Sequence, residues 1–176
     1  MRGTIFAAGL LSAVLLAGAM SAAGLQPVPV SDDELSTAIG QLGDFDYGVR
    51  TGASGLVRRA PEAQARTALA EAVSSHEDEY VRFRALVLLV GFGGREAEAA
   101  VLEAVADPND RLRAVAYGYF EHNPDPTMAG RLLAAIETET SEFVRPALIR
   151  ALAAHDADPA VRERLVADID RGVDFF

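Results

Sequence analysis

The chain has no cysteine and no lysine among its 176 residues. Without cysteine it can form no disulfide, offer no thiolate nucleophile or cysteine metal site, and carry no lipid on a thiol. Core packing must therefore supply the stability. All 16 basic residues are arginines, which we take as a compositional habit of the source genome rather than as a sign of function.

Motifs that carry common chemistries are also missing. The sequence contains neither a Walker lysine loop nor a Gly-x-Ser-x-Gly elbow, and it has no paired cysteines. No catalytic constellation stands out from the remaining residues. We therefore predict no catalytic residue and no cofactor, and an enzyme is the minority interpretation.

Acidic residues dominate the charge. The 26 aspartates and glutamates outnumber the basic residues and give a formal net charge of -10. Such a surface repels a phosphate backbone, which argues against nucleic acid as a partner. A basic protein or peptide is the partner that this charge favours.

The N-terminus predicts export. Arg2 is followed by an apolar run from Thr4 to Met20 and by small residues up to Gly24, the pattern of a signal peptide over residues 1–23. Ser21 with Ala23, or Ala17 with Ala19, supplies the small side chains that cleavage needs, and the mature chain is expected to begin near Gly24. Cleavage implies an exported, periplasmic protein. The alternative is an uncleaved anchor, because the run is almost long enough to span a bilayer and would make the chain a membrane-tethered spacer.

Structure is expected to begin at Ser31. Pro27 and Pro29 prevent a helix, so residues 24–30 are predicted to be an extended leader. Ser31 and Glu34 then form a capping-box pair that opens a helix. One domain is expected over residues 31–176, because a chain of this length buries one core.

The rest of the chain repeats at intervals of 32, 31 and 32 residues. The register is an apolar residue followed by an arginine, and four residues before each arginine stands a side chain that can cap a helix. The arginines are Arg50, Arg82, Arg113 and Arg145, and the capping residues are Asp46, Asp78, Asn109 and Ser141.

Each set of capping residue, apolar residue and arginine marks the start of an amphipathic helix. A Gly- or Pro-rich break and then a second helix follow it. A pair of short helices cannot bury its own apolar stripes, so four such hairpins are expected to stack side by side behind an N-terminal capping helix. Pro146 follows Arg145 directly, so the helix of the fourth unit is expected to start late or to kink.

These marks resemble the HEAT repeat, specifically the shorter bacterial variety found in phycobilisome-lyase-like proteins. The resemblance implies an all-α, right-handed α-α superhelix that serves as a protein-interaction scaffold. It also implies a structural ladder in which Arg50, Arg82, Arg113 and Arg145 pair with acidic residues around the turn of a neighbouring unit. The available acidic residues are Asp46, Asp78, Asp107 and Glu142.

The second helices of HEAT-like proteins usually line the concave side, where an extended partner can lie. Here the candidate solvent-facing residues are Arg66, Glu71, Glu96, Glu103, Arg131, Glu137, Arg162, Glu163 and Asp168. We select Glu96, Glu103, Arg131, Glu137 and Arg162 as partner-binding residues. The alternative is an ordinary solvated face, since exposed helices commonly alternate in charge.

A metal-dependent module is the rival hypothesis. His122 and His155 fall at similar places in successive units, and Asp158 lies near the second. Histidine and aspartate can hold a divalent ion, although the spacing matches no known zinc motif. No metal site is therefore predicted, and these three residues remain weak candidates.

Overall fold

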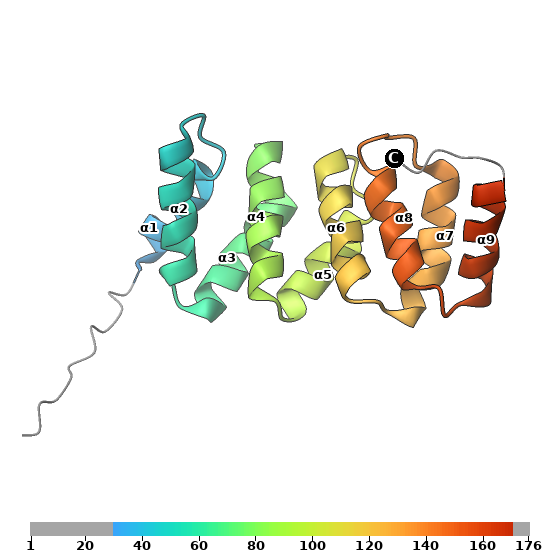
Figure 1. Ribbon diagram of the computed structural model, residues 1–176. Helices are drawn as coiled ribbons and strands as arrows, with labels where there is room; N and C mark the ends of the chain where they lie inside the picture. The colour runs from blue at the N-terminus through green and yellow to red at the C-terminus, as the bar shows by residue number, and fades with distance from the viewer. Residues whose placement is uncertain (1–29, 171–176) are drawn as a thin grey trace, which may run out of the picture.

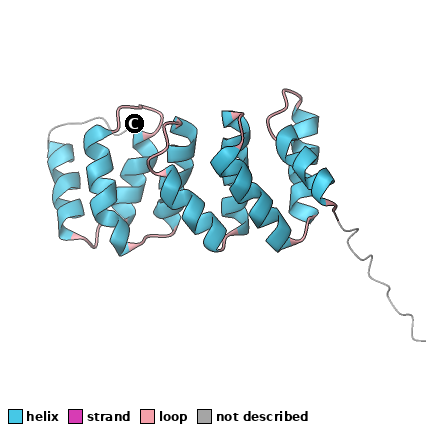
Figure 2. Cartoon of the chain, turned by 180° about the vertical axis from the view of Figure 1, so that it is seen from behind, coloured by secondary structure: helices cyan, strands magenta, loops and turns pink. Residues whose placement is uncertain are grey.

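The computed structural model describes residues 30–170. The proposed signal peptide, residues 24–29 of the leader and the last six residues, 171–176, lie outside the described part. Within residues 30–170 the chain forms nine α-helices and no strand. Figure 2 shows these helices joined by loops. The prediction of an all-α fold is confirmed.

The helices follow one another through short turns (Figure 1). They are α1 (Asp32–Gln41), α2 (Tyr47–Arg59), α3 (Glu62–Ser75), α4 (Glu79–Phe92), α5 (Arg95–Ala104), α6 (Asp110–His122), α7 (Ala129–Thr138), α8 (Arg145–Ala154) and α9 (Pro159–Asp170), with the 3₁₀ turn η1 (Pro126–Met128) before α7.

Two layers of helices make up the array. The first layer holds α2, α4, α6 and α8, and α6 packs against both α4 and α8. The second layer holds α1, α3, α5, α7 and α9, in which α3 packs against both α1 and α5. Contacts therefore run mainly between helices that are near one another along the array, within a layer or across the two layers, which is the quasi-one-dimensional arrangement expected of a solenoid. In Figure 1 the array extends from α1 at one end to α9 at the other.

The helix starts follow the expected capping chemistry in three of the four units. The carboxylate oxygens of Asp46 and Asp78 accept hydrogen bonds from the first amides of α2 and α4, and the side-chain oxygen of Asn109 does the same for α6. The capping box of Ser31 and Glu34 at α1 is also confirmed, with both reciprocal bonds formed. Each cap satisfies amides that have no partner inside the helix.

The fourth unit starts late, as Pro146 predicts. Its helix begins at Arg145 behind Val144, and Ser141 does not cap it. The Ser141 hydroxyl instead donates to Asp110 Oδ2 at 2.6 Å. Proline fits the first turn of a helix, where its missing N–H has no partner to lose, and this explains why α8 is shortened rather than kinked.

Gly93 and Gly94 end α4 with a backbone that other residues rarely adopt. Their φ values are +68° and +85°, in the region that costs glycine nothing because it has no Cβ. A Cβ on Gly94 would also lie 3.0 Å from Cζ of Arg66 on α3. The glycines in this break therefore permit both the turn and the approach of the α3 side chain.

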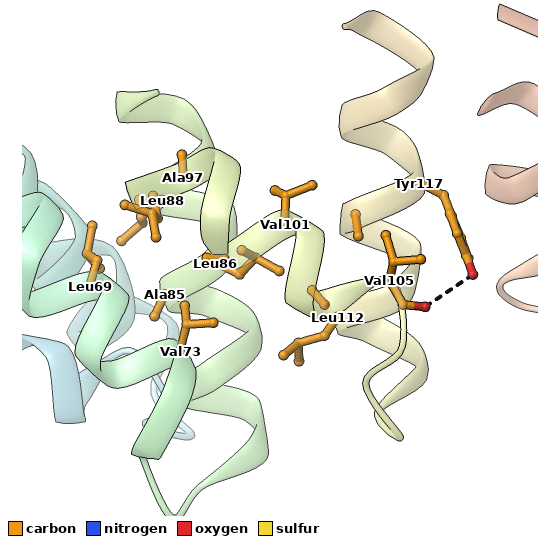
Figure 3. Packing of buried hydrophobic residues seen from close by; sticks show 14 of the residues in the cluster. Leu69, Val73, Ala85, Leu86, Leu88, Ala97, Val101, Val105, Leu112 and Tyr117 are labelled. Carbon is orange, nitrogen blue, oxygen red and sulfur yellow. Dashed lines mark hydrogen bonds between the residues drawn. The ribbon is translucent and has the colours of Figure 1, made fainter. Parts of the chain in front are cut away.

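The core is aliphatic and lies between the two layers. Leu69, Leu86 and Leu89 are fully buried, and Figure 3 shows Leu69, Leu86 and Leu112 with other side chains of α3 to α6 directed into the space between these helices. The buried hydroxyl of Tyr117 donates to the carbonyl of Val105 at 3.3 Å. Burial raises the pKa of the Tyr117 phenol.

Truncating the centre of this core should be strongly destabilising. Leu86→Ala is expected to lower the free energy of unfolding by about 3 kcal/mol, because it removes buried methyl groups and leaves a cavity. Val87→Ala, one residue along α4 at a site that is 37% exposed, should cost much less. Urea unfolding of the two variants measures the difference, and equal losses would contradict this description of the core.

Candidate functional site

Five turns share one arginine contact. The arginine that opens a helix donates from a terminal guanidinium nitrogen to the backbone carbonyl six residues before it, at 2.6–3.0 Å. That carbonyl lies in the turn that follows the preceding helix, where carbonyls lack partners within the helix. The pairs are Arg50 to Asp44, Arg82 to His76, Arg113 to Asp107, Arg145 to Glu139 and Arg162 to Asp156.

The aspartates selected as ladder partners bind backbone amides. Asp46 and Asp78 cap their helices, and Asp107 accepts from the N–H of Asn109 at 2.7 Å. Glu142 is exposed in the turn before α8. Each arginine and each aspartate of the proposed ladder therefore forms a hydrogen bond with a backbone group of its own turn.

One arginine of the proposed ladder also pairs with a carboxylate from a different turn, that of Glu139, which the prediction did not include. Nε and a terminal nitrogen of Arg113 donate to the two carboxylate oxygens of Glu139 at 2.8 and 3.0 Å. The Glu139 side chain is 5% exposed. Arg113 also pairs with Asp110 at 2.6 Å, so a single guanidinium joins α6 to the end of α7.

Glu139 is ionised in this setting. Burial raises the pKa of its carboxyl, but hydrogen bonds from Arg113 and from the N–H of Ser141 outweigh burial, and the net pKa is lowered. The pKa of Asp110 is lowered chiefly by the hydrogen bond from the Ser141 hydroxyl; burial opposes this, and the hydrogen bond and charge of Arg113 lower the pKa further. The charge of Arg113 is thus matched on two sides.

Asp158 lies in the turn before α9, and Arg162 lies near the start of that helix. Asp158 Oδ1 accepts from the N–H groups of Ala160 and Val161, and Arg162 donates to the carbonyl of Asp156 at 2.8 Å. Asp158 and Arg162 stand in the same relation as Asp46 and Arg50. The sequence contained this signal, since Val161 precedes Arg162 as Val49 precedes Arg50.

The other selected residues lie on the second layer with different partners. Glu137 forms an ion pair with Arg164, and Arg131 donates to the carbonyl of Leu102 at 3.2 Å. Glu103 is exposed and Glu96 half-buried, and neither side chain forms an ion pair within residues 30–170.

Asp168 was predicted to face solvent, and this prediction is wrong because the residue is buried. It is 3% exposed, and its Oδ2 accepts from Arg164 Nε at 2.8 Å. The i, i+4 spacing of Arg164 and Asp168 on α9 brings the two side chains together, which lets the carboxylate be buried as a pair.

The second layer is furrowed between successive helices. A cleft of about 970 Å³ lies between α1 and α3, with Leu35, Ile39 and Ala68 among its lining residues and Glu71 and Glu77 also along it. A groove of about 240 Å³ between α3 and α5 includes Glu103 and Arg82. A third of about 320 Å³ between α7 and α9 includes Glu137 and Arg164.

The histidines are held by backbone groups. His155 is 5% exposed, with Nδ1 2.7 Å from the Ala151 carbonyl and Nε2 3.0 Å from both the N–H and the carbonyl of Asp125. His122 Nδ1 lies 2.9 Å from the Gly118 carbonyl. Among residues 30–170 no three acidic, histidine or cysteine side chains form a group that could hold a metal ion, so His122, His155 and Asp158 are not brought together as ligands.

Comparison with known families agrees with this architecture. The HEAT repeats family matches residues 65–153, about half of the chain and from α3 to α8. The chain belongs to the HEAT repeat family. HEAT repeats generally act as protein-interaction scaffolds. No curated protein matches the chain.

None of the helices in the described part is both long and apolar enough to cross a membrane.

The hydrogen bond from each arginine to a turn carbonyl should contribute measurably to the free energy of unfolding. Arg82→Gln should lower the free energy of unfolding by about 1 kcal/mol, because the carbonyl of His76 loses a charged donor. Arg95→Gln is the matched control, since Arg95 is exposed at the start of α5, where a positive charge opposes the helix dipole. Thermal unfolding compares the two variants, and an equal effect would contradict a structural role for Arg82.

The Arg113–Glu139 pair predicts a pH-dependent stability. Because the folded pKa of Glu139 is lowered, its contribution is fully present above the ordinary glutamate pKa and is lost as pH falls through the folded value. Glu139→Gln should therefore be less stable than the unaltered chain by about 2 kcal/mol at neutral pH. The difference should vanish in acid.

Urea titrations at a series of pH values measure that difference. Asp110 is present in both proteins, so its own titration cancels to first order. A difference between the two proteins that stayed constant with pH would show that the Glu139 charge does not stabilise the fold.

Proposed function

We propose that this is an exported, periplasmic HEAT-repeat scaffold that binds another protein or a peptide through its second-layer face. The observation that carries the proposal is the set of three furrows between second-layer helices, each with glutamate among its lining residues. Concave apolar surface with a few charged groups at its edge is the usual form of a recognition site.

Charge favours a basic partner. The chain carries a net charge of -10, and Glu71, Glu103 and Glu163 are exposed on α3, α5 and α9. Such a face attracts a positively charged partner and speeds its approach, whereas the aliphatic walls of the furrows supply contact area.

The proposal of export depends on the N-terminal sequence. Arg2, the apolar run that follows it and the small residues at Ser21 and Ala23 support a cleaved signal peptide. The repeat interval of 31 to 32 residues supports membership of the shorter bacterial variety of the family, the one seen in phycobilisome-lyase-like proteins.

Cross-linked capture of the tagged chain from its native host tests both halves of the proposal. A carboxylate-directed or photoreactive cross-linker is needed, because the chain has no lysine. Mass spectrometry should find an exported protein as the partner and a mature N-terminus at Gly24. An N-terminus at Met1 would instead indicate the tethered spacer.

Charge reversal should then locate the binding face. Glu96→Arg with Glu103→Arg is expected to weaken binding of the captured partner about tenfold, because attractive contacts become repulsive. Glu142→Arg is the control, in a turn away from the furrows. If only the control weakened binding, the second-layer face would not be the site.

A further inference from the structure

The cleft between α1 and α3 differs from the two grooves along the array. It is the largest of the three, and its lining contains Asp32, Glu71 and Glu77 but no arginine. Each of the other two includes an arginine among its lining residues, Arg82 in one and Arg164 in the other. Only in the α1–α3 cleft, among these three, do carboxylates occur without a basic side chain beside them.

The walls of this cleft are apolar and its rim is polar. Leu35 and Ile39 of α1 and Ala72 of α3 are buried beneath it, while Glu71 and Glu77 are exposed. Neither of these glutamates forms an ion pair within residues 30–170. The more exposed Ala63 and Ala68 of α3 add apolar contact area to this lining, and the two glutamates leave unmatched negative charge at its edge.

The other polar side chains named here as lining the cleft form no ion pair with Glu71 or Glu77. Asp32 accepts a hydrogen bond from Gln64 Nε2 at 2.5 Å, and Gln64 carries no charge of its own. His76 Nδ1 accepts a hydrogen bond from the N–H of Asp78 at 3.0 Å. A ligand that fits the cleft must bring positive charge to it.

We propose that the α1–α3 cleft is the docking site for a basic amphipathic segment of a partner protein. This proposal rests on the scaffold function above and assigns its site. The segment's aliphatic side chains pack on Ala63 and Ala68 of α3, above the buried Leu35 and Ile39. Its arginine or lysine side chains pair with Glu71 and Glu77 at the rim.

Two other occupants fit the charge less well. Val30, the last residue of the chain's own leader, lies close by, since Gln64 also donates to its carbonyl. Residues 24–30 carry no charge, however, and would leave the three carboxylates unmatched. A second copy of the chain brings its own net charge of -10 and is repelled.

A labelled synthetic peptide tests the site directly. The probe alternates leucine and arginine at helical spacing, and its control replaces every arginine with citrulline, which keeps the shape and removes the charge. Fluorescence anisotropy with the full chain at physiological ionic strength should detect binding of the arginine peptide and at least about tenfold weaker binding of the citrulline peptide.

Two kinds of variant locate the peptide. Glu71→Arg with Glu77→Arg reverses the rim, and Ser36→Trp fills the cleft from α1 without changing its charge. Each is expected to weaken binding about tenfold. Glu98→Arg with Glu142→Arg changes the net charge equally on exposed sites outside the cleft and should have less than about a twofold effect.

The outcomes separate this proposal from the scaffold function. Equal weakening by the control pair, or unchanged binding after filling the cleft, overturns the site. Tighter peptide binding after Leu25→Ser and Val28→Ser would identify the leader as the occupant, and a dimer in sedimentation that Ser36→Trp abolishes would identify a second copy. Either result also overturns it.

The captured partner gives the second readout. If that partner still bound the cleft variants but not Glu96→Arg with Glu103→Arg, the scaffold function would stand and the cleft would not be its site. If the host yielded no partner at all, the scaffold function itself would fail, whatever the peptide does.

Discussion

The array depends on how each turn fixes one helix to the next. A helix that ends leaves carbonyls without partners, and the helix that follows begins with free amides. Here an arginine donates back to a carbonyl of the turn, and in four of the five turns an aspartate or asparagine caps the new helix. The free carbonyls of one helix end and the free amides of the next helix start thus find partners within one short segment. These bonds set the direction of the next helix.

With the turns fixed, the two layers can bury a continuous aliphatic core. No disulfide braces the fold, so packing and these polar turns carry it together. Arg113 adds one connection of a different kind, because its guanidinium also holds the buried carboxylate of Glu139. Burial of that ion pair is tolerated because its oxygens are matched by Arg113 and by the N–H of Ser141.

Much of this fold could be predicted from local pattern. The capping residues and the late start of α8 at Pro146 follow from chemistry within one turn. Three features did not follow: the pairing of Arg113 with Glu139, the cleft between α1 and α3, and the burial of Asp168. The first two join residues about one repeat apart, so they depend on how neighbouring units pack, which periodicity does not state. The turn of Asp158 and Arg162 is different, because the sequence there has the same four-residue spacing of capping residue and arginine as the other turns. Arg162 follows Arg145 by only 17 residues, however, so this turn does not fit the repeat interval.

The acceptor in each turn is a main-chain carbonyl, and the residues that provide it are Asp44, His76, Asp107, Glu139 and Asp156. Since every residue has a carbonyl, the contact survives any replacement at that place in the turn. A duplicated unit therefore brings its own complete connection with it and needs no matching change in its neighbour. Arrays of this kind can lengthen by gene duplication one unit at a time, while the outward side chains remain free to diverge toward new partners.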